Sequence, residues 1–223
     1  MGVHFFKRQV WALTLGALAS IAPMAQAASP DLVISQIYGG GGSAGAPFTH
    51  DIIEVFNRGP APVNLNGWSV QYASATGSSW SNKTLLTNIV LAPGQYYLLQ
   101  GASNGANGVA LPAADVVGSI NLSGTAGKVA LVNSTSTITS GITCPTAAEG
   151  VVDLVAYGTT ASNCAAMGVT PAPSVANAVK RAAAGCTDTD NNPSDFAAAS
   201  PAPRNTATAL TPCSAGANIS LSV

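Results

Sequence analysis

The best case for acid–base or metal chemistry in this sequence is the group His50-Asp51-x-x-Glu54. Metal-assisted hydrolysis needs several carboxylates around a divalent cation, and usually a histidine as general acid or base. Along a strand, however, His50 and Asp51 face opposite sides, and Glu54 faces the same side as His50. The pattern favours structural roles, in which Glu54 pairs with an arginine such as Arg58 or caps a loop. We therefore predict no catalytic residues and no enzymatic activity.

A second group of oxygen ligands lies late in the chain, where Asp188, Asp190 and Asn192 alternate. This spacing resembles the first half of a calcium-binding loop, and Asp195 could add a further carboxylate. The pattern lacks the glycine after the third ligand, and Ala199 stands where such loops carry a bidentate glutamate. The competing interpretation is a cluster of Asx turns, in which the side chains accept backbone N–H groups. The missing ligands favour the turn cluster over calcium, the only cofactor that the sequence suggests.

Trp80 is the aromatic residue best suited to an exposed binding contact, because Ser78-Ser79-Trp80-Ser81-Asn82 is a polar run typical of a loop. The alternative is that its ring folds back onto the edge of a sheet. Trp68, Tyr96 and Tyr97 belong instead to segments with the alternation of strands. That alternation predicts core packing for these three rings rather than ligand stacking.

The first 27 residues have the pattern of a secretory signal peptide. A positive start at Lys7-Arg8 precedes an apolar run over residues 10–22, and Ala25-Gln26-Ala27 fits a small-x-small cleavage site. The apolar run is shorter than the roughly 20 residues that span a bilayer, and Pro23 interrupts it. We expect cleavage after Ala27 and a secreted, extracellular or periplasmic domain over residues 28–223, with no transmembrane segment.

The charge balance argues against a protein that binds polyanions. The chain carries 8 Lys and Arg against 9 Asp and Glu, and removal of Lys7 and Arg8 leaves 6 against 9. The resulting mature charge of −3 does not favour binding to nucleic acid. Charged residues make up only 8% of the chain, so Ser, Thr, Asn and Gly must supply most of the polar surface.

Short β-branched and aromatic segments, separated by Gly, Pro and Asn clusters, dominate the rest of the chain. They predict strands over residues 32–38, 51–58, 68–72, 95–100, 128–133, 151–157 and 178–182. Apolar residues occupy both faces of the second segment, which predicts a central strand covered on both sides. In the third segment, alternation places Trp68, Val70 and Tyr72 in the core. Ser69 and Gln71 between them are expected to face water.

All four cysteines, Cys144, Cys164, Cys186 and Cys213, follow the predicted cleavage site. An even number in an exported chain favours disulfides over free thiols or zinc. Of the three connectivities we predict the sequential one, which joins the first to the second and the third to the fourth. Each bridge closes a loop of about 20 to 30 residues, for which chain entropy gives roughly 3 kcal/mol. The second bridge should hold down the C-terminal tail.

Four motifs follow one another in a fixed order along the chain. FNRGPAPVNLNGWSV, at 56–70, is a strand ending in Asn that leads through a turn to a Leu-x-Gly-Trp element. LAPGQYYLL, at 91–99, is a Pro-Gly turn feeding a Tyr-rich strand, and DLVAYG follows at 153–158. DTDNNPSDF, at 188–196, comes last, together with Pro203-Arg204-Asn205. In this order the motifs resemble the lamin-tail domain family in its exported bacterial type. The resemblance implies an immunoglobulin-like antiparallel β-sandwich, here with long loop insertions.

The resemblance and the composition together favour a secreted, non-catalytic domain that binds an unknown protein or glycan partner. The resemblance also implies an alternative, since exported members of the family are often joined to domains that cleave phosphodiesters. This chain could be an accessory partner of an extracellular nuclease, engaging nucleic acid or the enzyme. A structural role in the cell envelope or matrix is the third interpretation.

Overall fold

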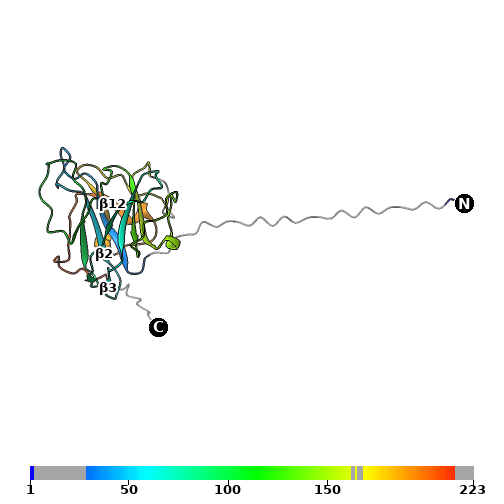
Figure 1. The fold of residues 1–223 in the computed structure, drawn as a ribbon, viewed down its shortest axis with the longest axis horizontal. Helices are drawn as coiled ribbons and strands as arrows, with labels where there is room; N and C mark the ends of the chain where they lie inside the picture. Colours follow the sequence, from blue (N-terminus) through cyan, green and yellow to red (C-terminus); the bar gives the residue numbers. More distant parts are fainter. Residues whose placement is uncertain (3–28, 162–163, 165–167, 214–223) are drawn as a thin grey trace, which may run out of the picture.

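Two β-sheets pack face to face in the computed structural model, which describes residues 1–2, 29–161, 164 and 168–213 (Figure 1). The larger sheet has six strands, in the spatial order β12 (Phe196–Ala199), β11 (Ala178–Arg181), β1 (Leu32–Tyr38), β2 (Ile52–Asn57), β7 (Tyr96–Gln100) and β8 (Val116–Val117). The smaller sheet has four strands, in the order β10 (Val151–Tyr157), β9 (Gly127–Val132), β4 (Ser69–Ser74) and β5 (Asn82–Leu85). Two short strands, β3 (Val63–Asn64) and β6 (Val90–Leu91), pair with each other.

The pairing confirms an all-β sandwich. Neighbouring strands run antiparallel throughout the described sheets except for β7 and β8, which form a parallel pair at one edge. Helical structure among the described residues is limited to three short pieces, η1 (Ala147–Glu149), η2 (Ala183–Gly185) and α1 (Asn192–Asp195). Among the described residues, no helix is long and apolar enough to cross a membrane. Apart from Met1 and Gly2, the predicted signal peptide lies outside the described residues.

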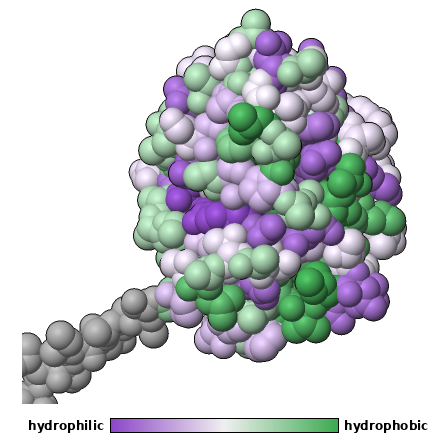
Figure 2. Space-filling view, turned by 90° about the vertical axis from the view of Figure 1, so that its left-hand side faces the viewer, coloured by the Kyte–Doolittle hydropathy of each residue, from purple (hydrophilic) through white to green (hydrophobic). Residues whose placement is uncertain are grey.

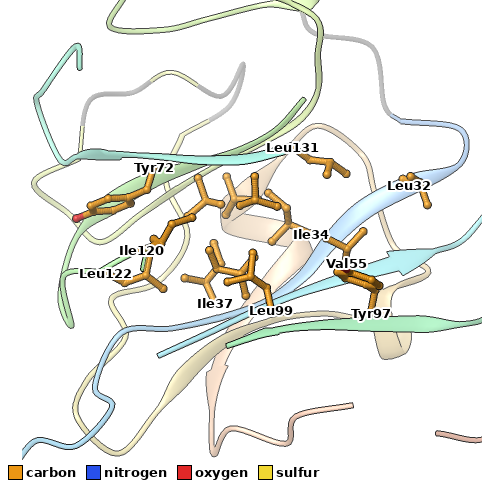
Figure 3. Close-up of a cluster of buried hydrophobic side chains, with 14 of the residues drawn as sticks. Leu32, Ile34, Ile37, Val55, Tyr72, Tyr97, Leu99, Ile120, Leu122 and Leu131 are labelled. Atoms are coloured by element: carbon orange, nitrogen blue, oxygen red, sulfur yellow. The ribbon is translucent and has the colours of Figure 1, made fainter. Parts of the chain in front are cut away.

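The main core lies between the two sheets, where alternate side chains of facing strands meet (Figure 3). β2 contributes Ile53 and Val55, and β9 contributes Val129 and Leu131, because successive side chains of a strand point to opposite faces. The other face of β2 is covered as well, since Ile52 is fully buried in a separate apolar cluster. The predicted central strand with two covered faces is therefore confirmed.

A loop insertion covers the outer face of the smaller sheet. Gln71 on β4 is fully buried, donates from Nε2 to Ser136 O (2.8 Å) and accepts from Ile138 N (2.9 Å). Ser69 is buried beside it and donates to Ser134 O (2.7 Å). The prediction that Ser69 and Gln71 face water is wrong, because the segment after β9 folds back and uses their side chains as its anchor.

The C-terminal strap, residues 200–213, crosses the outer face of the larger sheet. Ala202 N donates to the Gln36 side chain on β1 (2.8 Å), and Thr206 N donates to Asp115 just before β8 (3.1 Å). Gly94 has a φ of 77°, and a Cβ there would overlap Pro212 of the strap. The Pro-Gly turn before β7 therefore needs glycine both for its backbone angle and for close contact with the strap.

Candidate functional site

The three residues considered for acid–base chemistry, His50, Asp51 and Glu54, make separate contacts in the structure. Glu54 is fully buried and accepts from Ser35 Oγ (2.6 Å) and from Arg204 Nη2 (2.6 Å). Its second oxygen accepts the backbone N–H of Arg204 (2.8 Å). Glu54 thus fastens the C-terminal strap to β2. The predicted pairing of Glu54 with an arginine is confirmed, but the arginine is Arg204 and not Arg58, the example given.

Asp51 joins two loops to the start of β2, a central strand of the larger sheet. It is fully buried, and its two oxygens accept from Gly41 N (3.0 Å) and Leu122 N (2.8 Å). Burial raises its pKa to about 6, and the two N–H donors offset only part of that rise. His50 is half-buried and lies with Nδ1 2.9 Å from Thr49 Oγ1. The carboxyl group therefore holds backbone in place rather than facing a shared site with His50.

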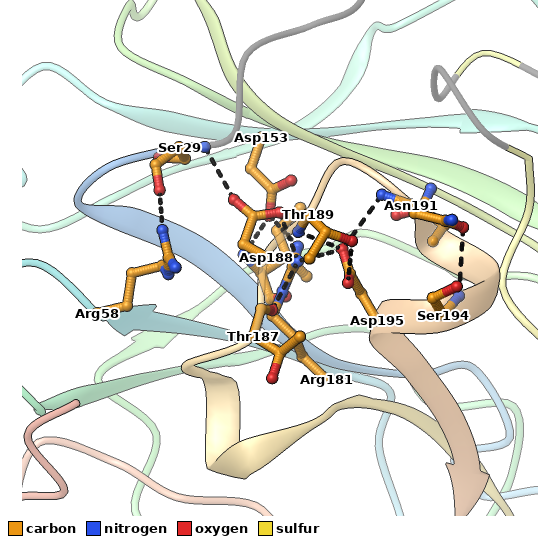
Figure 4. Close-up of polar contacts among 12 residues, drawn as sticks. Ser29, Arg58, Asp153, Arg181, Thr187, Asp188, Thr189, Asn191, Ser194 and Asp195 are labelled. Carbon is orange, nitrogen blue, oxygen red and sulfur yellow. Dashed lines mark hydrogen bonds and ion pairs between the residues drawn. The ribbon is translucent and has the colours of Figure 1, made fainter. Parts of the chain in front are cut away.

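Arg181 is the centre of a buried ionic cluster that sequence reasoning missed (Figure 4). Its guanidinium group contacts Asp153 (2.8 Å) and Asp188 (2.9 Å), and Asp195 lies at 3.7 Å. We call these four residues the Arg181 cluster. The guanidinium also donates to Ile34 O (3.0 Å) and stacks 4.5 Å from the centre of the Phe196 ring. The cluster therefore ties β1, β10, β11 and the loop before β12 together at one end of the sandwich.

The loop that resembles a calcium site is folded around these contacts. Asp195 accepts from Thr189 N (2.8 Å) and Thr189 Oγ1 (2.7 Å), so its carboxylate closes the loop onto a residue six positions earlier. Asn192 donates from its side-chain amide to Gly168 O (3.4 Å). Asp190 has a φ of 56°, and burial together with the nearby carboxylates raises its pKa to about 6. Within the described residues, no set of three His, Cys, Asp or Glu side chains is placed to hold a metal ion.

The aspartates of that loop bind backbone through contacts other than Asx turns. Asp188 accepts the backbone N–H of Ser29, 159 residues away in the chain, and Asp195 accepts that of Thr189. Asp188 and Asp190 lie close enough for their charges to interact, but Asp188 is already paired with the Arg181 guanidinium. The Arg181 guanidinium lies among the carboxylates, at the position that a metal ion would occupy.

Trp80 is not the exposed contact that the polar run around it suggests. The ring is 1% exposed and packs in a second apolar cluster with Ala130, Val132 and Ile138. Its Nε1 donates to Ile142 O (2.8 Å). The alternative, in which the loop folds the ring back onto the sheet, describes the structure. The serines around Trp80 indicated an exposed loop, but a second loop, which carries Ile138 and Ile142, covers the ring.

Lys128 shares this second core and was also missed. It is fully buried on β9, and its Nζ donates to Gly77 O (2.6 Å) and Thr143 O (2.8 Å). Nζ lies 5.6 Å from the centre of the Trp80 ring, and burial lowers the pKa of the lysine. The sequence did contain a signal for such buried charges, which is a single charged residue in an otherwise apolar strand. Lys128 in GKVALV and Asp153 in VVDLVAY both fit that pattern.

The predicted disulfide pairing is confirmed. Cys144 is bonded to Cys164, 20 residues away, and Cys186 is bonded to Cys213, 27 residues away. The first bridge closes the insertion that covers the smaller sheet. The second bridge fixes the end of the C-terminal strap to the segment before α1, as expected for a device that holds down the tail.

Among the pockets on the described surface we consider two, and we name each by its lining. The proline pocket, of about 500 Å³, lies beside the second disulfide and is lined by Pro30, Pro60, Pro93, Pro212 and Arg58. The hydroxyl pocket, of about 440 Å³, is lined mainly by Ser134, Ser136, Thr137, Thr139 and Glu149. On the face shown in Figure 2, apolar residues form small separate groups among polar ones. These pockets are therefore better candidates for recognition than any broad apolar area on that face.

One protein family, described as Lamin Tail Domain, has a model that matches residues 25–159 of the chain. The match covers more than half of the sequence and includes every strand from β1 to β10. No curated protein matches the chain. The match ends before β11, β12 and the strap, although these segments complete both the larger sheet and the Arg181 cluster.

Proposed function

Because this chain belongs to the lamin tail domain family, we propose that it is a secreted, non-catalytic binding module whose partner is a protein or a glycan. The proposal rests on one observation, which is that the side chains best suited to chemistry are engaged in structural contacts. Asp51, Glu54 and the aspartates of the Arg181 cluster each bind backbone N–H groups or an arginine. These side chains hold the loops and the strap in place. Their structural role supports a protein that binds a partner through its surface rather than one that catalyses a reaction.

Export is the second part of the proposal. The sequence over residues 1–27 has the features of a cleavable signal peptide. The two disulfides support the same interpretation, because such bonds persist in oxidising compartments outside the cytoplasm. Intact mass of the protein recovered from outside the cytoplasm tests it. The mass should correspond to a chain that begins at Ala28.

The binding surface is proposed to include one of the two pockets. Loops tied to a rigid sandwich commonly carry recognition, because the sheets fix where the loops lie. The proline pocket offers apolar rings with one guanidinium group, and the hydroxyl pocket offers hydrogen-bonding groups that suit a polar chain such as a glycan. The first lies at the end of the strap, and the second lies on the disulfide-closed insertion.

Affinity capture from the extracellular fraction tests the proposal, with residues 28–223 as bait. Pro60→Arg blocks the proline pocket and Thr137→Arg blocks the hydroxyl pocket, and both positions are exposed, so the fold should tolerate the changes. The proposal expects a partner that one variant loses and the other keeps. Capture of DNA that weakens steeply with salt would favour the nuclease-accessory alternative instead. A partner that both variants retain equally would place the binding surface elsewhere.

A further inference from the structure

The C-terminal strap crosses the outer face of the larger sheet, and side chains of the sheet hold its backbone. Three N–H groups of the strap, each two residues from the next, donate to side-chain oxygens: Ala202 N to Gln36 Oε1 (2.8 Å), Arg204 N to Glu54 Oε2 (2.8 Å) and Thr206 N to Asp115 Oδ2 (3.1 Å). Contacts at every second residue are those of an extended segment laid over a surface.

The three acceptors stand in a row across the sheet. Gln36 on β1 is paired in register with Glu54 on β2, and Glu54 is paired with Leu98 on β7. Asp115 continues the row, because it accepts the N–H of Leu98 (2.7 Å). The sheet therefore fixes the spacing of all three acceptors.

The side chain of Arg204 enters a pocket beside this row. Its Nη2 and Nε contact the two oxygens of Glu54 (2.6 and 3.2 Å), and its guanidinium carbon lies 3.7 Å from the centre of the Tyr96 ring. A planar guanidinium makes the paired contact and the ring contact together, whereas a lysine ammonium is a point charge. The pocket therefore selects arginine. We call Gln36, Glu54, Tyr96 and Asp115 together the strap groove.

The strap leaves one group of the groove without a partner. Gln36 is fully buried, and its Nε2 has no hydrogen-bond partner among the described residues. Oε1 of the same amide binds Ala202 N, so Nε2 also lies against the strap. A buried donor without an acceptor is costly. The strap is thus an incomplete ligand, which a segment with an acceptor at this place improves upon.

The way the strap is anchored allows it to open. From residue 200 to residue 210, no backbone–backbone hydrogen bond joins it to a strand within the described structure. Its firm anchors are β12, which precedes it, and the Cys186–Cys213 bridge at its end. Local opening between the two anchors needs no covalent change.

We propose that the strap groove is a recognition site for an extended, arginine-containing segment of a partner protein, and that the strap occupies it as an internal competitor. The ligand places its arginine between the Glu54 carboxylate and the Tyr96 ring, where the charges are complementary. The groove lines neither the proline pocket nor the hydroxyl pocket, so this surface goes beyond the function proposed above. Because the strap is tethered, its high local concentration excludes weakly binding segments.

The test measures binding of a labelled peptide with the sequence of residues 200–212 to residues 28–223 with both disulfides intact. Wild type should bind it poorly, because its own strap fills the groove. Arg204→Ala weakens that strap and should bind the peptide at least about tenfold more tightly. Lys83→Ala, which removes a positive charge on β5 of the smaller sheet, should behave as wild type. Equal binding by wild type and Arg204→Ala, or no binding to folded Arg204→Ala at millimolar peptide, would overturn the proposal.

Changes in the peptide and in the groove identify the contacts. Lysine in place of the peptide's arginine should weaken binding to Arg204→Ala by about tenfold, and so should Glu54→Gln added to the protein. Binding that is insensitive to both changes would come from another surface and would contradict the proposal. If Arg204→Ala does not fold, Arg204→Lys keeps a positive charge beside Glu54 and replaces it in the same comparison.

Two further outcomes decide whether the ligand is a separate partner. Peptides varied at residues 201–203 should include some that bind about tenfold more tightly than the strap sequence, by offering an acceptor to Gln36 Nε2. Gln36→Met should remove that advantage. If no peptide exceeds the strap sequence, the groove serves its own strap alone and the proposal fails. A wild-type dimer that the peptide dissociates would assign the groove to the strap of a second copy and would overturn the assignment to a separate partner.

Discussion

The buried carboxyl group of Asp51 should make the protein more stable in mild acid than at neutral pH. Burial raises its pKa from 3.8 to about 6, so the folded state binds a proton more tightly than the unfolded chain does. Such a group contributes stability that is fully present below about pH 4, the unfolded-state value. That stability is lost as the pH rises through 6.

The size of the effect follows from the shift in pKa. Each pKa unit corresponds to about 1.4 kcal/mol, so the change from 3.8 to about 6 is worth roughly 3 kcal/mol between pH 4 and pH 7. Asp51→Asn removes this dependence, because an amide does not titrate. The amide resembles the protonated acid in having one acceptor oxygen, so the stability of the variant should lie within about 1 kcal/mol of the wild type at pH 4.

The assay is urea unfolding of wild type and Asp51→Asn at pH 4, 5, 6 and 7 with the disulfides intact. The difference in free energy of unfolding should move by roughly 3 kcal/mol in favour of the variant as the pH rises from 4 to 7. Other titrating groups are common to both proteins and cancel in the difference. A difference in free energy of unfolding that does not change with pH, or that moves in favour of wild type, would refute the raised pKa assigned to the buried Asp51 carboxyl.

Three other substitutions test the polar and covalent contacts that hold the loops. Arg181→Met leaves buried carboxylates unpaired and should cost about 3 to 5 kcal/mol by urea unfolding, whereas Lys180→Ala, half-buried beside it, should change stability by much less. Trp80→Ala should cost about 3 to 5 kcal/mol by the same measurement and should leave partner capture intact at the temperature where the variant is folded. The double change Cys186→Ser and Cys213→Ser removes a bridge between residues 27 positions apart and should lower the free energy of unfolding by roughly 3 to 4 kcal/mol. Amide exchange should become faster in residues 200–213 before it does so elsewhere.

The sequence was sufficient for the strands that form the main core. The segment expected at 32–38 coincides with β1 and that at 151–157 with β10, and the other five predicted segments overlap observed strands. β-Branched alternation is strong in these segments because one face of each strand lies in the core. The short strands β3, β5, β6, β8 and β12 were not predicted, since two to four residues are too few to show a period.

The segments that cover the outer faces of the sheets, and the partners of the polar residues there, were beyond sequence reasoning. Alternation shows that Gln71 lies opposite the core, but it does not reveal that a loop some 65 residues later covers it. The same holds for Glu54, whose partner Arg204 is 150 residues away in the chain. Long-range pairing of a few charged residues depends on how loops return to the sheets. A single sequence carries no periodic signal for it.

Hydrolytic turnover by the purified domain is the measurement that tests the central claim most directly. The claim is that the candidate acid–base residues of this family member hold its loops and do no chemistry. Residues 28–223, supplied with magnesium, manganese or calcium, should cleave DNA, RNA, phosphate esters and peptides no faster than a blank. Turnover above the blank that disappears in His50→Ala, while the variant keeps the wild-type melting temperature, would contradict the claim and place a catalytic site at His50.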